Sequence, residues 1–154
     1  MADKFNTEGY YDPTAHDALS AIEKEEKAAR VFRPLTYICS PYAGDTASNI
    51  LAAQKYCRYA VDKGYLPFAA HLFFPQFLND EDPAERSLGI SFGNVFMDMC
   101  AEIWIFGSEY SAGMQAEYDR ATRKGYKIRC FTSDCREVGG TDYESLSGTC
   151  KRNY

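Results

Sequence analysis

Residues 102–117 read Glu-Ile-Trp-Ile-Phe-Gly-Ser-Glu-Tyr-Ser-Ala-Gly-Met-Gln-Ala-Glu and combine a strand pattern with a helix start. The short apolar run from Glu102 to Phe106 is typical of a buried strand. Ser111 is a favoured N-cap residue, so we expect the next helix at Ser111 to Lys124. A strand, a loop containing Gly107 and a helix thus follow one another.

The same alternation continues on both sides of this segment. Short apolar runs that alternate with amphipathic helices indicate a parallel sheet with helices on both faces. We therefore predict an α/β fold, a three-layer Rossmann-like or flavodoxin-like parallel sheet of four to five strands, with an additional N-terminal helix. The other expected strands are Leu35 to Cys39, Tyr65 to Ala70 and Tyr126 to Phe131, and the other expected helices are Thr14 to Ala29, Ser48 to Lys63 and Asp82 to about Cys100.

Apolar spacing predicts which face each middle helix buries. Asp82 at the N-cap, Pro83 at the first helical position and Glu85 at the third form a strong start for the second of these helices. The expected buried positions are Ile50, Ala53, Cys57 and Val61 in the first helix, and Leu88, Phe92, Val95, Phe96 and Met99 in the second.

The chain is expected to hold one domain. Residues 1–13 are polar and contain Gly9 and Pro13, which predicts a mobile N-terminal arm. The helix after it has a charged face and is expected at the surface, as a candidate oligomer contact. Residues 14–154 then form the domain, with its core at 35–131 and a polar C-terminal tail at 132–154, in which Tyr143 and Leu146 are candidates for packing.

Composition narrows the class of protein. The 154 residues are 45% hydrophobic and 25% charged, which is ordinary for a soluble domain. Seventeen basic residues against 22 acidic ones leave a net charge of −5, which disfavours nucleic acid as a partner. We find no signal peptide and no apolar run of membrane-spanning length, so we expect a cytoplasmic protein without a membrane partner.

The six cysteines form no C-x-x-C pair, so we expect buried reduced thiols, with a loose cluster of Cys130, Cys135 and Cys150 as the weaker alternative. His16 and His71 are the only histidines, which excludes a His-rich zinc site. We therefore expect neither a metal nor a cofactor.

Candidate site residues follow the expected strands, because ligands of open parallel sheets bind beyond the carboxyl ends of the strands. Three segments qualify, at 40–45, 71–80 and 107–117. In the third, Ser111 caps the helix, and the N–H groups of Ala112, Gly113 and Met114 would face an anion. Glu117 lies where the helix macrodipole favours an ionised carboxylate, as a nucleophile requires. The alternative is an ordinary cap followed by a solvent-facing glutamate.

The other two segments offer further candidates, each with a structural alternative. His71 is either a satisfied histidine at the end of the second strand or a proton carrier or phosphate contact. Tyr37 is a core residue unless Glu117 lies beside it. The aromatic loop after His71 is a lid over a flat ring or a core plug, and Arg86 is a candidate anion contact. Ser40 and Tyr42, from the loop after the first strand, are candidate substrate contacts.

Four motifs together resemble the nucleoside 2-deoxyribosyltransferase-like superfamily from about Leu35 to Phe131. They are Ser-Pro-Tyr at 40–42, Pro-Phe-Ala-Ala-His at 67–71, Trp-Ile-Phe-Gly at 104–107 and Ser-x-Gly-Met-x-x-Glu at 111–117. The combination is most similar to an uncharacterised branch beside the 2'-deoxynucleoside 5'-phosphate N-hydrolases. The resemblance implies a small-molecule nucleoside or nucleotide as substrate, and a homo-oligomer.

The resemblance also implies roles for individual residues. Glu117 matches a glutamate that attacks the anomeric carbon of the sugar, and Tyr37 matches a tyrosine beside that nucleophile. Ser111 matches the serine that contacts the 5'-phosphate in the hydrolases, where the transferases have aspartate. His71 matches a histidine that ends their second strand. Asn94 stands where the relatives have a catalytic aspartate, and an amide cannot deliver a proton.

Several functions therefore stay open. Asp98, one turn after Asn94, is a doubtful substitute for the acid, because it lies ~6 Å further from the ligand edge. The leading hypothesis is N-glycosidic cleavage or deoxyribosyl transfer through a covalent glycosyl-glutamate. The alternative is a nucleotide-binding or sensing module without catalysis. A phosphoribohydrolase of the lysine-decarboxylase-like type is disfavoured, because its Pro-Gly-Gly-x-Gly-Thr run is missing.

Overall fold

The computed structural model describes residues 13–138. The predictions for the N-terminal arm before Pro13, for Tyr143 and Leu146, and for Cys150 in the cysteine cluster fall outside the described residues. The chain divides into two units, residues 1–32 and 33–154, and each is described by itself. In the first unit, α1 spans Pro13–Ala29 and has no buried residue, and even its apolar side chains Leu19 and Ile22 are about half exposed.

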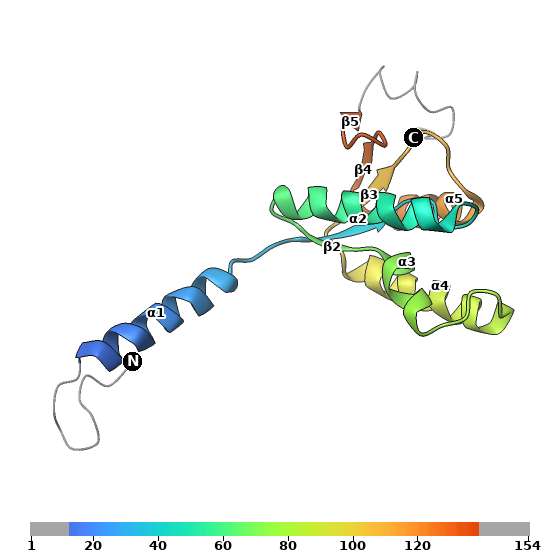
Figure 1. The fold of residues 1–154 in the computed structure, drawn as a ribbon. Helices are drawn as coiled ribbons and strands as arrows, with labels where there is room; N and C mark the ends of the chain where they lie inside the picture. Colours follow the sequence, from blue (N-terminus) through green and yellow to red (C-terminus); the bar gives the residue numbers. More distant parts are fainter. Residues whose placement is uncertain (1–12, 139–154) are drawn as a thin grey trace. The chain divides into compact units, whose positions relative to one another are not determined.

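The second unit is a five-stranded sheet in the order β2-β1-β3-β4-β5 (Figure 1). The first four strands in this order run parallel, and β5 pairs antiparallel with β4. The strands are β1 (Leu35–Cys39), β2 (Leu66–Phe68), β3 (Glu102–Phe106), β4 (Ile128–Phe131) and β5 (Glu137–Val138), and the helices are α2 (Thr46–Asp62), α3 (Ala70–Phe73), the 3-10 helix η1 (Phe74–Gln76), α4 (Pro83–Met99) and α5 (Ala112–Arg123).

Helices cover both faces of this sheet, which confirms the predicted three-layer α/β fold. Successive side chains of a strand point to opposite faces, so the two central strands contribute to two cores. One core joins Tyr37 and Ile103 to α4 and α5. The other joins Ile38 and Trp104 to α2. All five residues of β3 are buried, as expected for the central strand of a parallel sheet.

The second strand is shorter than predicted. It ends at Phe68, and Ala70 already begins α3, so His71 lies on a short helix and not at the end of the strand. Pro67 has no N–H to donate, and within residues 13–138 β2 is an edge strand whose pairing partner is β1 alone. The expected aromatic loop is likewise helical in α3 and η1. Beyond Thr132, Glu137 and Val138 form a strand in the segment expected as a polar tail.

The buried stripe predicted for α4 is wrong at four of its five positions, whereas the fifth, Phe96, is half-buried and stacks on Phe68 with ring centroids 4.1 Å apart. Leu88, Phe92, Val95 and Met99 are 38–64% exposed, whereas Gly93 and Met97 are buried. The helix is apolar on several sides, so periodicity alone did not identify its packing face. Helix α4 packs against the sheet through the face that carries Gly93, because this small residue allows the closest approach to β1.

Helix α2 is also turned from the predicted orientation. Ala53 is buried as expected, but the other buried positions are Tyr56 and Ala60, and Val61 is exposed. The Tyr56 ring stacks on Phe106 with centroids 4.1 Å apart, and this aromatic contact sets the face that α2 presents to the sheet.

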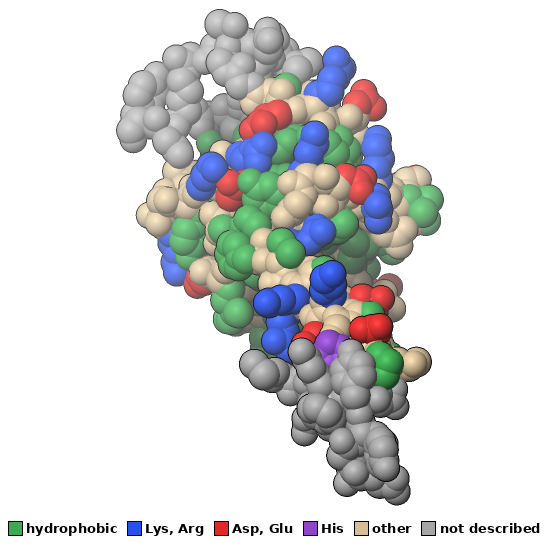
Figure 2. Space-filling model, turned by 90° about the vertical axis from the view of Figure 1, so that its left-hand side faces the viewer, with side chains coloured by type: hydrophobic (Ala, Val, Ile, Leu, Met, Phe, Trp, Pro, Cys, Tyr) green, Lys and Arg blue, Asp and Glu red, His purple; other side chains and the backbone are tan. Residues whose placement is uncertain are grey.

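The surface is mixed in character. On the face in Figure 2, Lys and Arg side chains are interspersed with acidic and hydrophobic ones. None of the helices within residues 13–138 is long and apolar enough to span a membrane. In the same part of the chain, no three His, Cys, Asp or Glu side chains gather in a metal-binding arrangement.

Candidate active site

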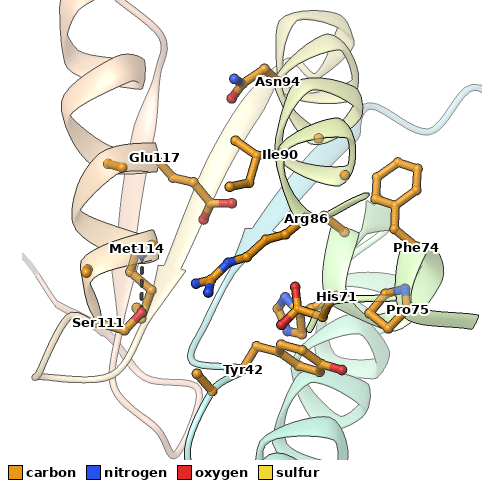
Figure 3. Close-up of a pocket in the computed structure, with 18 of the residues that line it drawn as sticks. Tyr42, His71, Phe74, Pro75, Arg86, Ile90, Asn94, Ser111, Met114 and Glu117 are labelled. Atoms are coloured by element: carbon orange, nitrogen blue, oxygen red, sulfur yellow. Dashed lines mark hydrogen bonds between the residues drawn. The ribbon is translucent and has the colours of Figure 1, made fainter. Parts of the chain in front are cut away.

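A cavity of about 470 Å³ opens beyond the carboxyl ends of β1 and β3, between α4 and α5 (Figure 3). This volume is within the usual range of small-molecule sites. Its wall contains every site residue predicted from the sequence, although these residues come from segments far apart in the chain. They are Tyr37, Ser40, Tyr42, His71, Arg86, Asn94, Ser111, Gly113, Met114 and Glu117.

Tyr37 and Glu117 are joined directly. The Tyr37 hydroxyl donates a hydrogen bond to Glu117 Oε1 at 2.7 Å, across 80 residues of sequence. Tyr37 is a buried residue of β1, and Glu117 lies in the second turn of α5. In Figure 3 the Glu117 carboxylate points into the cavity, not into bulk solvent. The interpretation of Glu117 as a solvent-facing residue is therefore wrong.

Cys39 is a second donor to Glu117, and sequence reasoning missed it. Its thiol hydrogen-bonds to the carboxylate and is fully buried. Residues two apart on a strand face the same side, so Cys39 joins Tyr37 beneath α5. That alternation was the available signal, because the sequence had already paired Tyr37 with Glu117.

Burial has the largest effect on the charge of Glu117. It raises the pKa of Glu117 above its ordinary value, and the hydrogen bonds from Cys39 and Tyr37 oppose this effect only in part. The helix macrodipole, the one influence on this charge that is visible in the sequence, favours the carboxylate. In the folded protein, loss of water outweighs it, so Glu117 is a more basic carboxylate than an exposed one.

The N-terminal end of α5 lines one end of the cavity. Ser111 is the N-cap, and its hydroxyl accepts a hydrogen bond from the Met114 N–H at 3.3 Å. Of the three N–H groups expected to face an anion, that of Met114 is therefore used within the helix. The N–H groups of Ala112 and Gly113 precede the first intrahelical bond and are available to a ligand. A Cβ at Gly113 would meet only Ser111 Oγ, at 3.9 Å.

His71 and its neighbours form another part of the wall. Ser40 Oγ lies 3.1 Å from His71 Nε2, and the Tyr42 and His71 rings are 5.6 Å apart. Burial lowers the pKa of His71 to about 4, so the imidazole is neutral at pH 7. This favours a hydrogen-bonding role over that of a proton carrier. Asn49 Nδ2 donates to the carbonyl groups of Tyr42 and Ala43, each at 3.0 Å, and holds this loop.

Three arginines line the wall, Arg86, Arg120 and Arg123, and their surroundings differ. Arg120 donates to both oxygens of Asp98, at 2.6 and 2.9 Å. Arg86 is exposed, and none of the ion pairs within residues 13–138 involves it. Its side chain extends from α4 across the cavity toward α5 (Figure 3). Arg123 is likewise exposed and outside those ion pairs, but it lies in the last turn of α5, so Arg86 is the arginine placed to meet an anion at the start of that helix.

Asn94 lines the cavity on α4, beyond Ile90 and farther from Ser111 (Figure 3). Asp98 does not replace it as an acid. The bonds from Arg120, Tyr126 and Lys124 hold the pKa of Asp98 well below its ordinary range, and Asp98 is not among the residues that line the cavity. An amide thus stands in the cavity wall at the position where the resemblance implies a catalytic aspartate.

The apolar part of the wall was not identified as such from sequence. Phe74, Pro75, Leu78 and Ile90 line it, together with the carboxyl groups of Asp80 and Glu85. Phe74 is buried, whereas Phe73 and Phe77 are about half exposed. The aromatic segment therefore packs into the core at Phe74, as in one of its two predicted uses, and also lines the cavity, whereas its use as a lid over a flat ring stays a prediction.

Comparison with known proteins shows the family to which the chain belongs and a protein of similar fold. No curated protein matches it. The 2-deoxyribosyltransferase from the psychrotolerant bacterium Bacillus psychrosaccharolyticus has a similar structure, with a TM-score of 0.52 and 14% sequence identity, over 73% of this chain and 82% of that chain. At this identity the likeness shows the fold alone. A family model described as a domain of unknown function (DUF7768) matches residues 34–131, more than half of the chain, and the protein therefore belongs to this family.

Proposed function

We propose that the protein cleaves the N-glycosidic bond of a nucleoside or nucleotide, with Glu117 as the nucleophile. The observation that carries the proposal is the hydrogen bond from Tyr37 to Glu117 inside the cavity. A half-buried carboxylate held in one orientation is suited to attack a sugar carbon. The 2-deoxyribosyltransferase with a similar fold acts by its name on deoxyribosyl groups, which supports this substrate class.

The reaction has two steps. A Glu117 oxygen forms a bond to the anomeric carbon while the bond from that carbon to the base nitrogen breaks, which leaves a covalent glycosyl-enzyme. Water or a second base then attacks the same carbon and releases Glu117 as a carboxylate. Tyr37 and Cys39 orient the carboxylate, and His71 with Ser40 contributes neutral hydrogen-bonding groups.

The start of α5 favours a phosphorylated substrate. Ser111 and the N–H groups of Ala112 and Gly113 lie at the positive end of the helix, where a phosphate is stabilised. Arg86 extends toward the same end of the cavity. A nucleoside 5'-monophosphate would therefore bind with its phosphate between Arg86 and Ser111 and its anomeric carbon near Glu117.

Two measurements test this proposal together: the amount of free base released and the mass of the enzyme. Nucleosides and 5'-nucleotides, each in the ribo and 2'-deoxy form, are incubated with the protein, and free base is measured by chromatography. We expect base release and a glycosyl-enzyme mass increase in the wild type, and neither in Glu117→Gln. Glu109→Gln is the matched control, because Glu109 is exposed and lies outside the cavity wall. Full activity of Glu117→Gln would refute the proposal.

A second function is favoured by Asn94. Without the acid, the same cavity could bind or sense a nucleotide and release no base. Thermal stabilisation by a nucleotide, with no free base and no mass increase over the whole panel, would identify this binding module. The homo-oligomer implied by the resemblance stays a prediction, which sedimentation at several protein concentrations would test.

A further inference from the structure

The departing base takes with it the electron pair of the broken bond, and the charge of this pair must be neutralised. A neutral purine or pyrimidine leaves as an anion unless a general acid protonates it, and such an acid typically contributes a factor of about 10² to 10⁴. The charge of the leaving group therefore decides whether the cavity must supply a proton. If Glu117 acts as the proposed nucleophile, this charge determines which bases the site accepts.

The nitrogen-bearing groups of the described cavity wall are poor proton donors. Asn94 carries an amide, which does not ionise. His71 is neutral at pH 7, and its Nε2 lies against Ser40 Oγ. A guanidinium such as that of Arg86 keeps its protons at every pH where proteins are folded.

The tyrosines of the wall are no better placed. Tyr37 gives its proton to the hydrogen bond with Glu117, and burial holds the pKa of Tyr37 well above its ordinary value. The hydroxyl of Tyr42 points away from Glu117 in Figure 3.

The carboxyl groups in the wall accept hydrogen bonds or face water. Glu117 is committed as the nucleophile. Glu85 accepts a hydrogen bond from the Asn79 N–H, and Asp80 is exposed. Asp80 and Glu85 therefore add formal negative charge to this wall.

The same wall is suited to a positively charged ring. The rings of Tyr42 and His71 lie 5.6 Å apart, and Phe74 lines the cavity on the same side, opposite α5 (Figure 3). Aromatic faces attract a cation, and the carboxylates of Asp80 and Glu85 add to that attraction. Arg86 reaches away from this side toward α5, where a phosphate would neutralise it.

We propose that the site takes N-glycosides whose base already carries a positive charge, such as a pyridinium or an N7-alkylated purine. When the carbon–nitrogen bond breaks, its electron pair neutralises the ring, and the base leaves without a proton. In the second step water attacks the anomeric carbon, Glu117 leaves as a carboxylate, and the proton of the water passes to solvent. Hydrolysis therefore releases one proton for each free base.

Matched pairs of substrates test the charge requirement with the wild-type protein. Nicotinamide mononucleotide is compared with its dihydronicotinamide form, and N7-methylguanosine 5'-monophosphate with guanosine 5'-monophosphate, each also as the 2'-deoxy compound. We expect kcat/KM, corrected for spontaneous cleavage, to be at least about 100-fold higher for the cationic member, as loss of a general acid implies. Glu117→Gln should remove the enzymatic rate for both.

The results separate the two proposals. A ratio below 100-fold between the members of a pair overturns the charge requirement and leaves Glu117 as a nucleophile. Absence of base release from every compound overturns the glycosidase itself.

A variant provides a second readout. Asn94→Asp introduces a carboxylic acid at the cavity wall, and Gln54→Glu, on the exposed side of α2, adds the same charge elsewhere. We expect Asn94→Asp to raise kcat/KM at least tenfold for the neutral substrates only. An equal rise for both members of a pair would show that protonation of the base does not distinguish them and would overturn the proposal.

Discussion

Gly93 of α4 lies directly against the Tyr37 hydroxyl, and a Cβ on Gly93 would stand 3.3 Å from that oxygen. The same hydroxyl holds Glu117, so the missing side chain at Gly93 gives the tyrosine room to reach the carboxylate. A helix glycine usually lowers stability relative to alanine by about 1 kcal/mol. Here the glycine has a use in the site that its helix position does not reveal.

We expect Gly93→Ala to reduce kcat/KM about tenfold, because a weakened hydrogen bond to a charged group costs about 1.5 kcal/mol. The gain in helix propensity offsets part of the overpacking, so the thermal midpoint should change little. Gly89→Ala is the matched control for propensity, since its Cβ would meet only Leu78 Cδ1, at 3.5 Å. Normal activity in Gly93→Ala would show that Tyr37 can still hold Glu117 beside an added Cβ, and would contradict this use of Gly93.

The pH profile should report the charge of Glu117. A nucleophile must be ionised, so kcat/KM should rise with pH through a pKa above the ordinary glutamate value, because burial raises it. Tyr37→Phe and Cys39→Ala each remove a donor to the carboxylate and should move this rise to higher pH, by about one unit, as a charge-assisted hydrogen bond implies. Profiles that coincide with the wild type would contradict the assignment.

Substitutions at Arg86 and Gly113 should weaken only the binding of the phosphate group. We expect Arg86→Gln to raise KM for a 5'-nucleotide about tenfold or more, the cost of a hydrogen bond to a charged group, and to leave the parent nucleoside unchanged. Gly113→Ala has space within the protein but would crowd a phosphate at the helix start. Arg58→Gln, in an exposed i,i+4 pair with Asp62, is the control. Equal effects on nucleoside and nucleotide would place the phosphate elsewhere.

Glu102 should contribute to stability on the other face of the sheet. It is buried and accepts from Trp104 Nε1 at 2.7 Å and from Arg129 at 3.2 Å. Burial raises the pKa of Glu102, but the bonds from Lys127, Trp104 and Arg129 outweigh it and leave the pKa below the ordinary value. The stabilisation is therefore present above the pKa of the unfolded chain and is lost as pH falls through the folded pKa.

We expect Glu102→Gln to lower the free energy of unfolding by about 1–3 kcal/mol at pH 7, the range for a hydrogen bond to a charged group, and less below pH 4. Urea unfolding of wild type and variant at both pH values measures this. The control is again Glu109→Gln. A difference that stays constant with pH would mean that the charge of Glu102 does not stabilise the fold.

The local sequence determined those elements that depend on interactions between residues close together in the chain. The mostly apolar run of β1 has the observed bounds because a strand buried on both faces is rich in apolar residues, and its buried polar residue Thr36 donates a hydrogen bond to the Glu102 carbonyl. Asp82 and Ser111 are N-caps because their side chains satisfy N–H groups two or three residues away. Such interactions depend on neighbours in the chain, so they can be read without the fold.

Tertiary structure decided which faces pack and which groups meet. Helix α4 has apolar residues around much of its surface, and only the fit of Gly93 against Tyr37 shows which side faces the sheet. The sequence named Tyr37 and Glu117, but their bond and the second donor Cys39 depend on β1 lying beside β3 and under α5. Burial, which sets the pKa of Glu117, is a property of the whole packed domain and has no local signature.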